Sequence, residues 1–521
     1  MKFTNQIFGL GFALASIVAC TDLEIEATDS IIDRSTATGG SFSGVADVDG
    51  AITNIYNGLN RLGDQANYHA LQEVSTDELL VPTRGTDWGD NGIWRTLHNH
   101  TWSPAHAFVL NTWNNWNSTI FLTNEVLDSR SNASTEQTAH ASFVRAFATW
   151  IILDLYGQVP NREPDEGPDV NPVVLSRSDA LTRVLADLDV AIAGLPTVAS
   201  GNISQQNRGS KAAARFLKAR VLLNAHVYRG DAQAASSDMD EVISLVDAIA
   251  ADGYTAQQGF FDIFKESADS ETIWWIPTGV GNRIWNGLHY NQVSPDNGGG
   301  GWNGFTTLAE FYDSFEGPAG SNAQGAGQEE RRGWVPDAST SNATNGGIGY
   351  GFLVGQQYNA SGDQINDRSG NPLVFTKALA GLYGNGEAEG IRTIKYHPVD
   401  GSGSFRAHEI LFRYADAHLM KAEAHMRKGE SAGALTLVNQ LRSLRGATPL
   451  SSLSEASMLA ERGRELYKEQ IRRTDLIRFG QFTRNWDYKD AGSVDDGNRN
   501  LYPIPSNAIL SNPNLTQNEG Y

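Results

Sequence analysis

The sequence predicts a mainly α fold, in which a tetratricopeptide-like helical scaffold carries a long irregular insertion of loops and short strands. Three observations predict it: four segments with strong helical periodicity, a helix-glycine-helix spacing that occurs twice, and a stretch rich in glycine, asparagine and aromatic residues between them. With 521 residues, 40% of them hydrophobic, the chain is long enough to bury a large core.

The N-terminus has the pattern of a lipoprotein signal. Lys2 precedes an apolar run from Ile7 to Val18, and small Ala19 stands directly before Cys20, the one cysteine of the chain. The run is too short to span a bilayer as a mature helix. We therefore expect a signal peptide over residues 1–19, lipidation of Cys20 and an acidic tether over residues 20–40. The alternative is an ordinary signal peptide with a coincidental cysteine.

Four segments are expected to be helices, and they place the scaffold at approximately 41–252 and 406–521 of a domain that spans 41–521. In the first of them, residues 143–160, apolar side chains recur every three or four positions, and Gly157 and Pro160 are placed to end the helix. The others are residues 211–235, 416–446 and 461–480.

A repeated spacing predicts paired helices. Ala225-x4-Gly230-x4-Ala235 recurs as Ala424-x4-Gly429-x4-Ala434, which is the helix-turn-helix pattern of tetratricopeptide-like repeats. Between the two copies, residues of approximately 253–405 have the composition of loops and short strands, and we expect them to form a ligand-binding insertion.

Composition excludes several classes of function. The net charge of −20 argues against nucleic acid as a partner and against electrostatic docking on anionic lipid. A single cysteine leaves no disulfide framework and no thiolate zinc cluster. We predict no cofactor and no metal, although His98, His100 and His106 offer an alternative metal site if His-x-His lies on a strand. Asp47 begins a calcium-loop-like sequence that lacks the later glutamate, which favours a helix-capping turn.

Two loops combine aromatic rings with polar side chains. One is WNGLHYNQVSPDNGGGGWNG, residues 285–304, and the other lies within residues 75–102. A sugar ring needs flat aromatic faces for stacking and planar polar groups for its hydroxyls, and both loops supply them. The candidate glycan-binding residues are Trp88, Trp285, Trp302, Asp77, Arg84, Asp87, Asp90, Asn91 and Tyr290. Trp94, Trp102, Trp113 and Trp116 have the surroundings of core residues.

No catalytic motif is recognisable. The chain has no Gly-x-Ser-x-Gly elbow, no His-Glu-x-x-His and no phosphate-binding glycine loop before a helix. A glycosidase needs two carboxylates that flank the scissile bond, and a pair such as Asp87 and Asp296 keeps that alternative open. We predict a protein that is not an enzyme.

Several motifs resemble those of the SusD/RagB family of outer-membrane lipoproteins. They are FVRAFATWIILDLYGQVP (143–160), LFRYADAHLMKAEAHMRKG (411–429), LVNQLRSLRG (437–446), ERGRELYKEQIRRTDLIRFG (461–480), LYPIPSNAI (501–509) and QNEGY (517–521). The resemblance implies a tetratricopeptide-containing fold and a ligand platform built from an early loop and a later aromatic loop. It also implies that the charged residues of these motifs form buried ion pairs or helix caps, namely Arg413, Asp416, Glu423, Arg442, Glu461, Arg472 and Asp475.

The same resemblance implies a function. We expect a lipid-anchored protein on the extracellular side of the outer membrane, which captures oligo- or polysaccharide for import by a SusC-like TonB-dependent transporter. The acidic chain favours a neutral glycan, such as a laminarin-type β-glucan. The alternatives are a surface protein-docking module with tetratricopeptide-like helices and, less favoured, a surface glycosidase.

Overall fold

The computed structural model describes residues 42–166, 170–265, 267–293, 299–399 and 408–521. The predicted signal peptide, the tether and Cys20 lie outside these residues. The chain separates into two units, Met1–Phe42 and Ser43–Tyr521, and the second contains all the elements that follow. Among the described residues, no helix is both long and apolar enough to cross a membrane.

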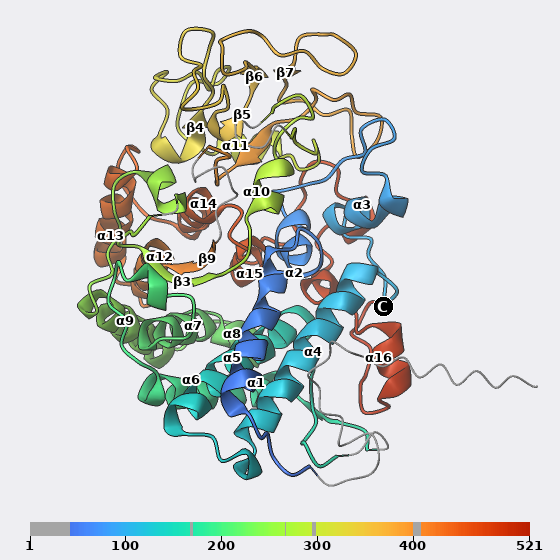
Figure 1. The fold of residues 1–521 in the computed structure, drawn as a ribbon, viewed down its shortest axis with the longest axis vertical. Coiled ribbons are helices and arrows are strands. Elements are labelled where there is room, and N and C mark those ends of the chain that lie inside the picture. The colour runs from blue at the N-terminus through green and yellow to red at the C-terminus, as the bar shows by residue number, and fades with distance from the viewer. Residues whose placement is uncertain (1–41, 167–169, 266, 294–298, 400–407) are drawn as a thin grey trace, which may run out of the picture. The chain divides into compact units, whose positions relative to one another are not determined.

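Most of the regular structure of the second unit is helical (Figure 1). The α-helices are α1 (Val48–Gly58), α2 (Asn67–His69), α3 (Ile93–His98), α4 (Ala107–Leu127), α5 (Thr135–Tyr156), α6 (Arg177–Gly194), α7 (Lys211–Leu223), α8 (Ala225–Arg229), α9 (Ser236–Ala251), α10 (Gly281–Trp285), α11 (Ala309–Asp313), α12 (Tyr414–Arg427), α13 (Ser431–Leu444), α14 (Glu455–Leu466), α15 (Arg472–Arg478) and α16 (Ser506–Ser511). Short 3₁₀ segments include η4 (Asp90–Gly92), η7 (Phe260–Phe264) and η8 (Glu330–Arg332), and one π-helical turn, η3, covers Ala70–Val74.

The strands are short and mostly belong to the middle of the chain. Apart from the hairpin of β1 (Val159–Asn161) and β2 (Val173–Leu175), they are β3 (Thr272–Ile276), β4 (Gly333–Trp334), β5 (Tyr350–Leu353), β6 (Gly355–Gln356), β7 (Val374–Phe375), β8 (Arg392–Ile394) and β9 (Glu409–Arg413). All pairings are antiparallel, in the orders β1-β2, β3-β9, β4-β5-β8 and β6-β7. The predicted mainly α fold with an irregular insertion is confirmed.

Helix α5 shows how local sequence defines an element. Its start is a capping box, in which the Ser134 hydroxyl accepts from the Gln137 N–H at 3.2 Å and the Gln137 side chain accepts from the Ser134 N–H at 2.8 Å. The helix ends at Gly157, which has φ of 73°. Between these caps, Phe143 and Phe147 are buried and pack edge-on against Trp274 of β3, with ring centroids 5.0 and 5.3 Å away.

The repeated glycine spacing marks two helix ends. Gly230 follows α8 with φ of 76° and Gly429 follows α12 with φ of 81°, and a methyl group at either position would meet nothing within 4 Å. Glycine is needed here for its left-handed backbone and not for space. In the helical layer, α7 packs against α9 and α12 against α13, as the predicted repeat requires.

The insertion has its own hydrophobic core, distinct from that of the scaffold. Strand β3 belongs to the insertion, but its buried Trp274 lies in the scaffold core, where it is the register partner of Phe412 of β9. This strand therefore joins the two regions. The second core is formed by Phe260, Phe264, Ile284, Trp285, Leu288, Phe311, Phe315, Phe352, Ile394 and Tyr467, among others. In Figure 1 the labelled strands β4 to β7 lie at the top of the view, and the long helices α4 to α7 lie below.

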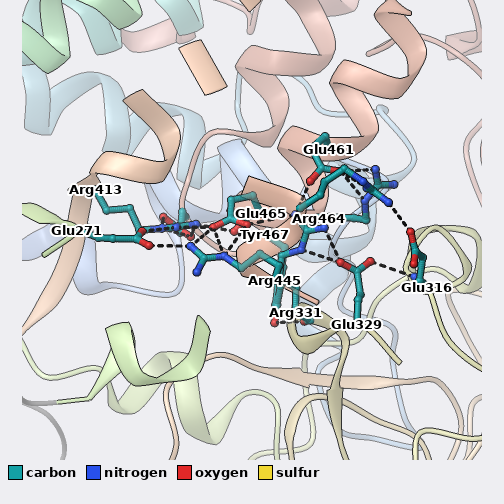
Figure 2. Close-up of polar contacts among 12 residues, drawn as sticks. Glu271, Glu316, Glu329, Arg331, Arg413, Arg445, Glu461, Arg464, Glu465 and Tyr467 are labelled. Atoms are coloured by element: carbon teal, nitrogen blue, oxygen red, sulfur yellow. Dashed lines mark hydrogen bonds and ion pairs between the residues drawn. The ribbon is translucent and has the colours of Figure 1, made fainter. Parts of the chain in front are cut away.

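The charged residues of the C-terminal motifs form buried ion pairs, as predicted (Figure 2). Arg413 contacts Glu271 at 3.0 Å and Glu465 at 2.8 Å, and Arg445 contacts the same two carboxylates at 2.7 and 2.9 Å. Arg331 contacts Glu461 at 2.7 Å. The other predicted residues are also paired: Arg442 with Glu461, Asp416 with Arg220 and Arg462, Glu423 with Arg478, Asp475 with Arg462, and Arg472 with Asp77.

This network joins the insertion to the scaffold. Glu271 precedes β3, Arg331 belongs to η8 of the insertion, and Glu461 and Glu465 belong to α14 of the scaffold. Breaking one side of such a buried pair leaves the other charge without compensation, at a cost of about 3–5 kcal/mol. The network therefore fixes the position of η8 relative to α14.

Candidate functional site: three loops and their exposed rings

Three loops far apart in the sequence meet at the candidate site: residues 83–95, the described part of 285–304, and residues 366–392. Backbone bridges join Leu80 to Thr306 and Thr307 to Ile391, which places the ends of these loops side by side. Residues 294–298, including Asp296 of the alternative glycosidase pair, lie outside the described part of the chain.

Arg84 ties the three loops together from inside. Its Nε donates to the carbonyl oxygen of Asn303 at 3.1 Å, and its Nη1 donates to the carbonyls of Gly386 at 3.1 Å and Glu389 at 2.5 Å. The residue is only 2% exposed, and burial lowers the pKa of its guanidinium to about 10. Arg84 was predicted to face the ligand; the predicted exposure is wrong, because the guanidinium is buried and donates from Nε and Nη1 to backbone carbonyls.

A second buried arginine, Arg392, makes similar contacts, and we call Arg84 and Arg392 the arginine clamp. Arg392 donates from Nε to the Asn303 side-chain oxygen at 2.8 Å and from Nη2 to the Glu387 carbonyl at 2.6 Å. The Asn303 amide nitrogen donates to the same carbonyl at 3.0 Å. Asn303, with φ of 53°, is thus held between two guanidinium groups and fixes the residue before it, Trp302.

Trp88 and Trp302 are joined directly. The indole N–H of Trp88 donates to the Trp302 carbonyl at 2.7 Å. Trp302 is 39% exposed, whereas Trp88 is half-buried and packs edge-on against Trp94 and Phe305 at 5.8 and 5.9 Å. The predicted exposure of Trp302 is confirmed, and Trp88 has one side in the core and one side at the surface.

The glycines of the aromatic loop allow close packing of backbone. A methyl group on Gly301 would lie 2.1 Å from the Leu288 carbonyl oxygen, and one on Gly304 would lie 2.4 Å from the Trp88 ring. The loop therefore needs these glycines for space. Large aromatic residues and glycines occur together here because the glycines let the loop backbone pack closely against Leu288 and against the Trp88 ring.

Beside the tryptophans, Tyr290 and Asp87 form a polar group with Arg368. The Tyr290 hydroxyl donates to Asp87 Oδ2 at 2.8 Å, and Arg368 Nη2 donates to the same oxygen at 2.6 Å. Arg368 also lies over the Tyr290 ring at 3.9 Å and binds the Glu387 carboxylate. Burial opposes ionisation of Asp87, but the hydrogen bonds from Tyr290 and Arg368 outweigh it and lower its pKa. Both Asp87 and Glu387 are therefore carboxylates paired with one arginine.

Asp90 and Asn91 lie at the surface of the same loop. Both are exposed and have positive φ, of 36° and 51°. Asp90 accepts from the Trp94 indole N–H at 2.8 Å, while Asn91 lies at the solvent side of η4. Both side chains are therefore exposed on the predicted loop, and that of Asp90 is bound by the buried Trp94.

The structure adds Tyr383 and Arg368, which sequence analysis missed. Tyr383 is 65% exposed, and the guanidinium of Arg95 lies 4.1 Å from its ring centre. A single aromatic between glycines, as in GLYGNG, was the available signal, but only the fold brings it beside residues 83–95. We use the term aromatic platform for the rings of Trp88, Tyr290, Trp302 and Tyr383.

Two predicted residues lie away from the platform surface. Trp285 is 6% exposed, because it ends the short helix α10 and packs into the core of the insertion; its predicted exposure is wrong. Asp77 is 3% exposed and binds Arg472 and Arg484, each at 2.8 Å. Burial would raise the pKa of Asp77, but the two arginines outweigh it and lower the pKa. Its contacts are those of a structural ion pair.

The three histidines considered as metal ligands make separate backbone contacts. Their Nε2 atoms lie 3.0 Å from the Asp487 carbonyl for His98, 2.8 Å from the Ser75 carbonyl for His100, and 3.0 Å from the Ile93 carbonyl for His106. The conditional assignment of His-x-His to a strand does not hold, since His98 ends α3 and His100 has φ of 61°. Asp47 caps α1 by accepting from Gly50 N–H at 2.9 Å, as predicted.

The surface of the site combines aromatic rings with planar polar groups. The platform offers faces of aromatic rings, and its polar groups are planar carboxylate, guanidinium and amide groups that match paired hydroxyls. Arg368 is paired with both carboxylates, Asp87 and Glu387. The site therefore offers ring faces for stacking and polar groups for hydrogen bonds.

Comparison with known proteins gives a consistent group of relatives. The model of the SusD family matches residues 270–521, and the model described as starch-binding associating with outer membrane matches residues 32–223. The chain is similar to the starch-binding protein SusD of Bacteroides thetaiotaomicron, with 27% identity over 499 residues that cover 86% of this chain and 84% of that protein. It is also similar to a SusD-like protein of Formosa agariphila, with 24% identity and coverage of 92% of this chain and 90% of that protein.

Solved structures share the fold. A SusD-like protein from Bacteroides fragilis has a TM-score of 0.69 at 19% identity, covering 92% of this chain and 98% of its own. Surface glycan-binding protein A from Bacteroides uniformis has a TM-score of 0.67 at 18% identity, covering 90% and 98%. A laminarin binding SusD-like protein has a TM-score of 0.64 at 18% identity, covering 92% and 100%.

Proposed function

The chain belongs to the SusD/RagB family of starch- and glycan-binding proteins, and from this we propose that it captures an oligo- or polysaccharide on the aromatic platform. The observation that carries the proposal is the hydrogen bond between Trp88 and Trp302, at 2.7 Å. It joins two loops that were predicted separately, one of which carries Asp87 and the other Tyr290 and the exposed Trp302. A rigid surface of rings and planar polar groups favours sugar binding, because little order has to be imposed on the protein when the ligand arrives.

We further propose that the ligand is neutral. The buried guanidinium groups of Arg84 and Arg392 are used on backbone carbonyls, and Arg368 is used on Asp87 and Glu387. An anionic polymer would meet a chain of net charge −20, in which Arg84 and Arg392 are buried and Arg368 is paired with two carboxylates. Our first candidate is a laminarin-type β-glucan, and a starch-type α-glucan is the second, because the similar SusD protein is named as starch-binding.

The cellular setting follows from the family and from Cys20. We propose that acyl chains on Cys20 anchor the protein in the outer membrane, facing outward, and that the glycan passes to a SusC-like TonB-dependent transporter. The description of one matching family, starch-binding associating with outer membrane, supports this setting.

The two alternatives have less support. A protein-docking module would present aromatic residues along helices, whereas the platform lies on loops. For a glycosidase, one carboxyl group must hold a proton as the general acid. Glu387 and Asp87 both have lowered pKa values: burial opposes the shift in each case, and the contacts with Arg368 outweigh it. We therefore propose a binding protein without catalytic activity.

Affinity gel electrophoresis tests the proposal. The wild type should be retarded in gels that contain a neutral glucan, and the variant Trp302→Ala should be retarded clearly less than the wild type. Trp275→Ala is a control, since Trp275 is a half-buried tryptophan that lies in β3 with its indole N–H bound to the Ile203 carbonyl at 2.8 Å. Retardation only by alginate or a sulfated galactan, or release of new reducing ends, would contradict the proposal.

A further inference from the structure

A second hollow lined by aromatic residues lies elsewhere in the insertion. It is a pocket of ≈ 540 Å³ between η7 and the strands β4 and β5, and Phe261, Trp334 and Tyr350 line it. This volume is in the range of small-molecule sites. The pocket shares no residue with the aromatic platform, and in Figure 1 the strands β4 and β5 lie above and to the left of α3, which follows the loop of Trp88.

The three rings form one continuous wall. The centroids of Trp334 and Tyr350 are 5.5 Å apart, and those of Phe261 and Tyr350 are 5.2 Å apart. His397 stacks on Tyr350 at 4.2 Å with planes 20° apart, which supports that ring from behind. Trp334 and Tyr350 are half-buried, whereas Phe261 is buried. Two rings are therefore partly open to a ligand and one supports them.

The polar side of the pocket combines glycine backbone with charged side chains. Gly325 and Gly327 line it, both with left-handed φ, of 76° and 91°, and a methyl group at either would meet nothing within 4 Å. Both glycines are exposed. Asp262 and Lys265, which also line the pocket, pair with each other at 2.5 Å. Peptide groups and paired charges suit hydroxyl groups, which donate and accept, and not an anion.

The wall is held rigid by the buried ion network. Glu329 and Glu330 line the pocket, and the next residue, Arg331, is fully buried between Glu329, Glu461 and Glu465 (Figure 2). The Glu330 N–H also donates to the Arg445 carbonyl at 3.0 Å. The segment that leads into Trp334 is therefore fixed before any ligand binds, which lowers the entropy cost of binding.

We propose that this pocket is a second carbohydrate site, which takes one or two neutral sugar rings with a sugar face against Trp334. The chemical class of the ligand rests on the proposed function. A nucleotide or other phosphate ligand is disfavoured, because Asp262, Glu329 and Glu330 outnumber Lys265 along the wall. Two separate sites on one chain would let a long glycan be held at both, which raises its apparent affinity over that of a short one.

Hydrogen-deuterium exchange of the full chain, analysed by peptide, tests this. The probes are laminarihexaose and maltohexaose, each added at millimolar concentration. We expect slower exchange in peptides that cover residues 325–334 and 350–353, in addition to peptides of the platform. Trp334→Ala should abolish the protection at the pocket, with at least a tenfold weaker apparent affinity there, and leave that of the platform unchanged. Trp334→Phe, which keeps a flat ring, should retain most of it.

This experiment distinguishes a failure of the second carbohydrate site from a failure of the proposed function. Protection only at the platform, unchanged in Trp334→Ala, would overturn the second site and leave the proposed function intact. Protection at the pocket that persists in Trp302→Ala supports two independent sites. Exchange unaffected by either probe at both places would count against the second site and against the choice of glucan. Thermal melting of each variant identifies a loss that is due to unfolding.

Discussion

At the scale of single residues, two tryptophans of one loop have opposite roles. Trp285 is buried in the core of the insertion and Trp302 is 39% exposed, although both occur in the same glycine-rich sequence. Sequence alone could propose the loop but could not separate the two, because burial of Trp285 depends on side chains of residues more than a hundred positions away, such as Ile394 in the same cluster.

The first prediction separates binding from stability. Trp302→Ala should weaken glucan binding at the platform several-fold to completely, because an exposed stacking face is lost, and should change the melting temperature little. Trp285→Ala should lower the free energy of unfolding by about 3–5 kcal/mol, because it leaves a cavity in the core. Calorimetric titration and urea unfolding of both variants check this. The assignment fails if Trp302→Ala unfolds more readily while it binds as the wild type does.

The second prediction concerns Gly304. Gly304→Ala should displace the Trp88 ring, since the added methyl group would lie 2.4 Å from it, and glucan binding should fall at least several-fold. Gly279→Ala is the control, because a methyl group at Gly279 meets nothing within 4 Å and its φ is not left-handed. Titration calorimetry on both variants gives the comparison. Equal affinity of the two would show that the position of Trp88 does not matter for the ligand.

At the scale of elements, the helices were predictable and the loops were only partly so. The apolar periodicity of residues 143–160 and the glycines after α8 and α12 are local signals, and the structure has helices where they predict them. The positions of Tyr383 and Arg368 depend on contacts with residues 95 and 87, almost three hundred positions earlier. No local pattern carries such information, and the roles of Arg84 and Asp77 as buried structural groups were missed for the same reason.

The third prediction concerns the acid stability of the network around α14. Burial alone would raise the pKa of Glu461, but three surrounding arginines outweigh it and lower the pKa to about 2, from an ordinary value of 4.5. Because the folded pKa is depressed, this group contributes its stability fully above pH 4.5 and loses it as the pH falls to 2. The shift corresponds to about 3 kcal/mol.

Urea unfolding at several pH values tests this. Glu461→Gln should be less stable than the wild type at pH 7, and the difference should shrink below about pH 4.5, as the wild-type carboxylate takes up its proton. Glu455→Gln is the matched control, since Glu455 is an exposed glutamate in the first turn of the same helix. A difference for Glu461→Gln that does not depend on pH would contradict the role of the ion pairs.

At the scale of the whole molecule, the fourth prediction concerns attachment. Cys20→Ala should give protein that is released from the membrane fraction and still binds glucan, because Cys20 precedes the folded unit that carries the platform. Membrane fractionation and affinity electrophoresis of the same preparation measure both properties. Equal membrane retention of the variant and the wild type would contradict lipidation at Cys20.

The arginine clamp also determines when, during synthesis of the chain, the three loops of the candidate site can come together. The contacts of Arg84 with Asn303, Gly386 and Glu389 close loops of 219, 302 and 305 residues. A nascent chain cannot form them until the ribosome has passed residue 389, however early its N-terminal helices fold. The proposed glycan site can therefore form only after residue 389 has been synthesised, and translation products that end earlier would carry the early tryptophan loop without the complete site.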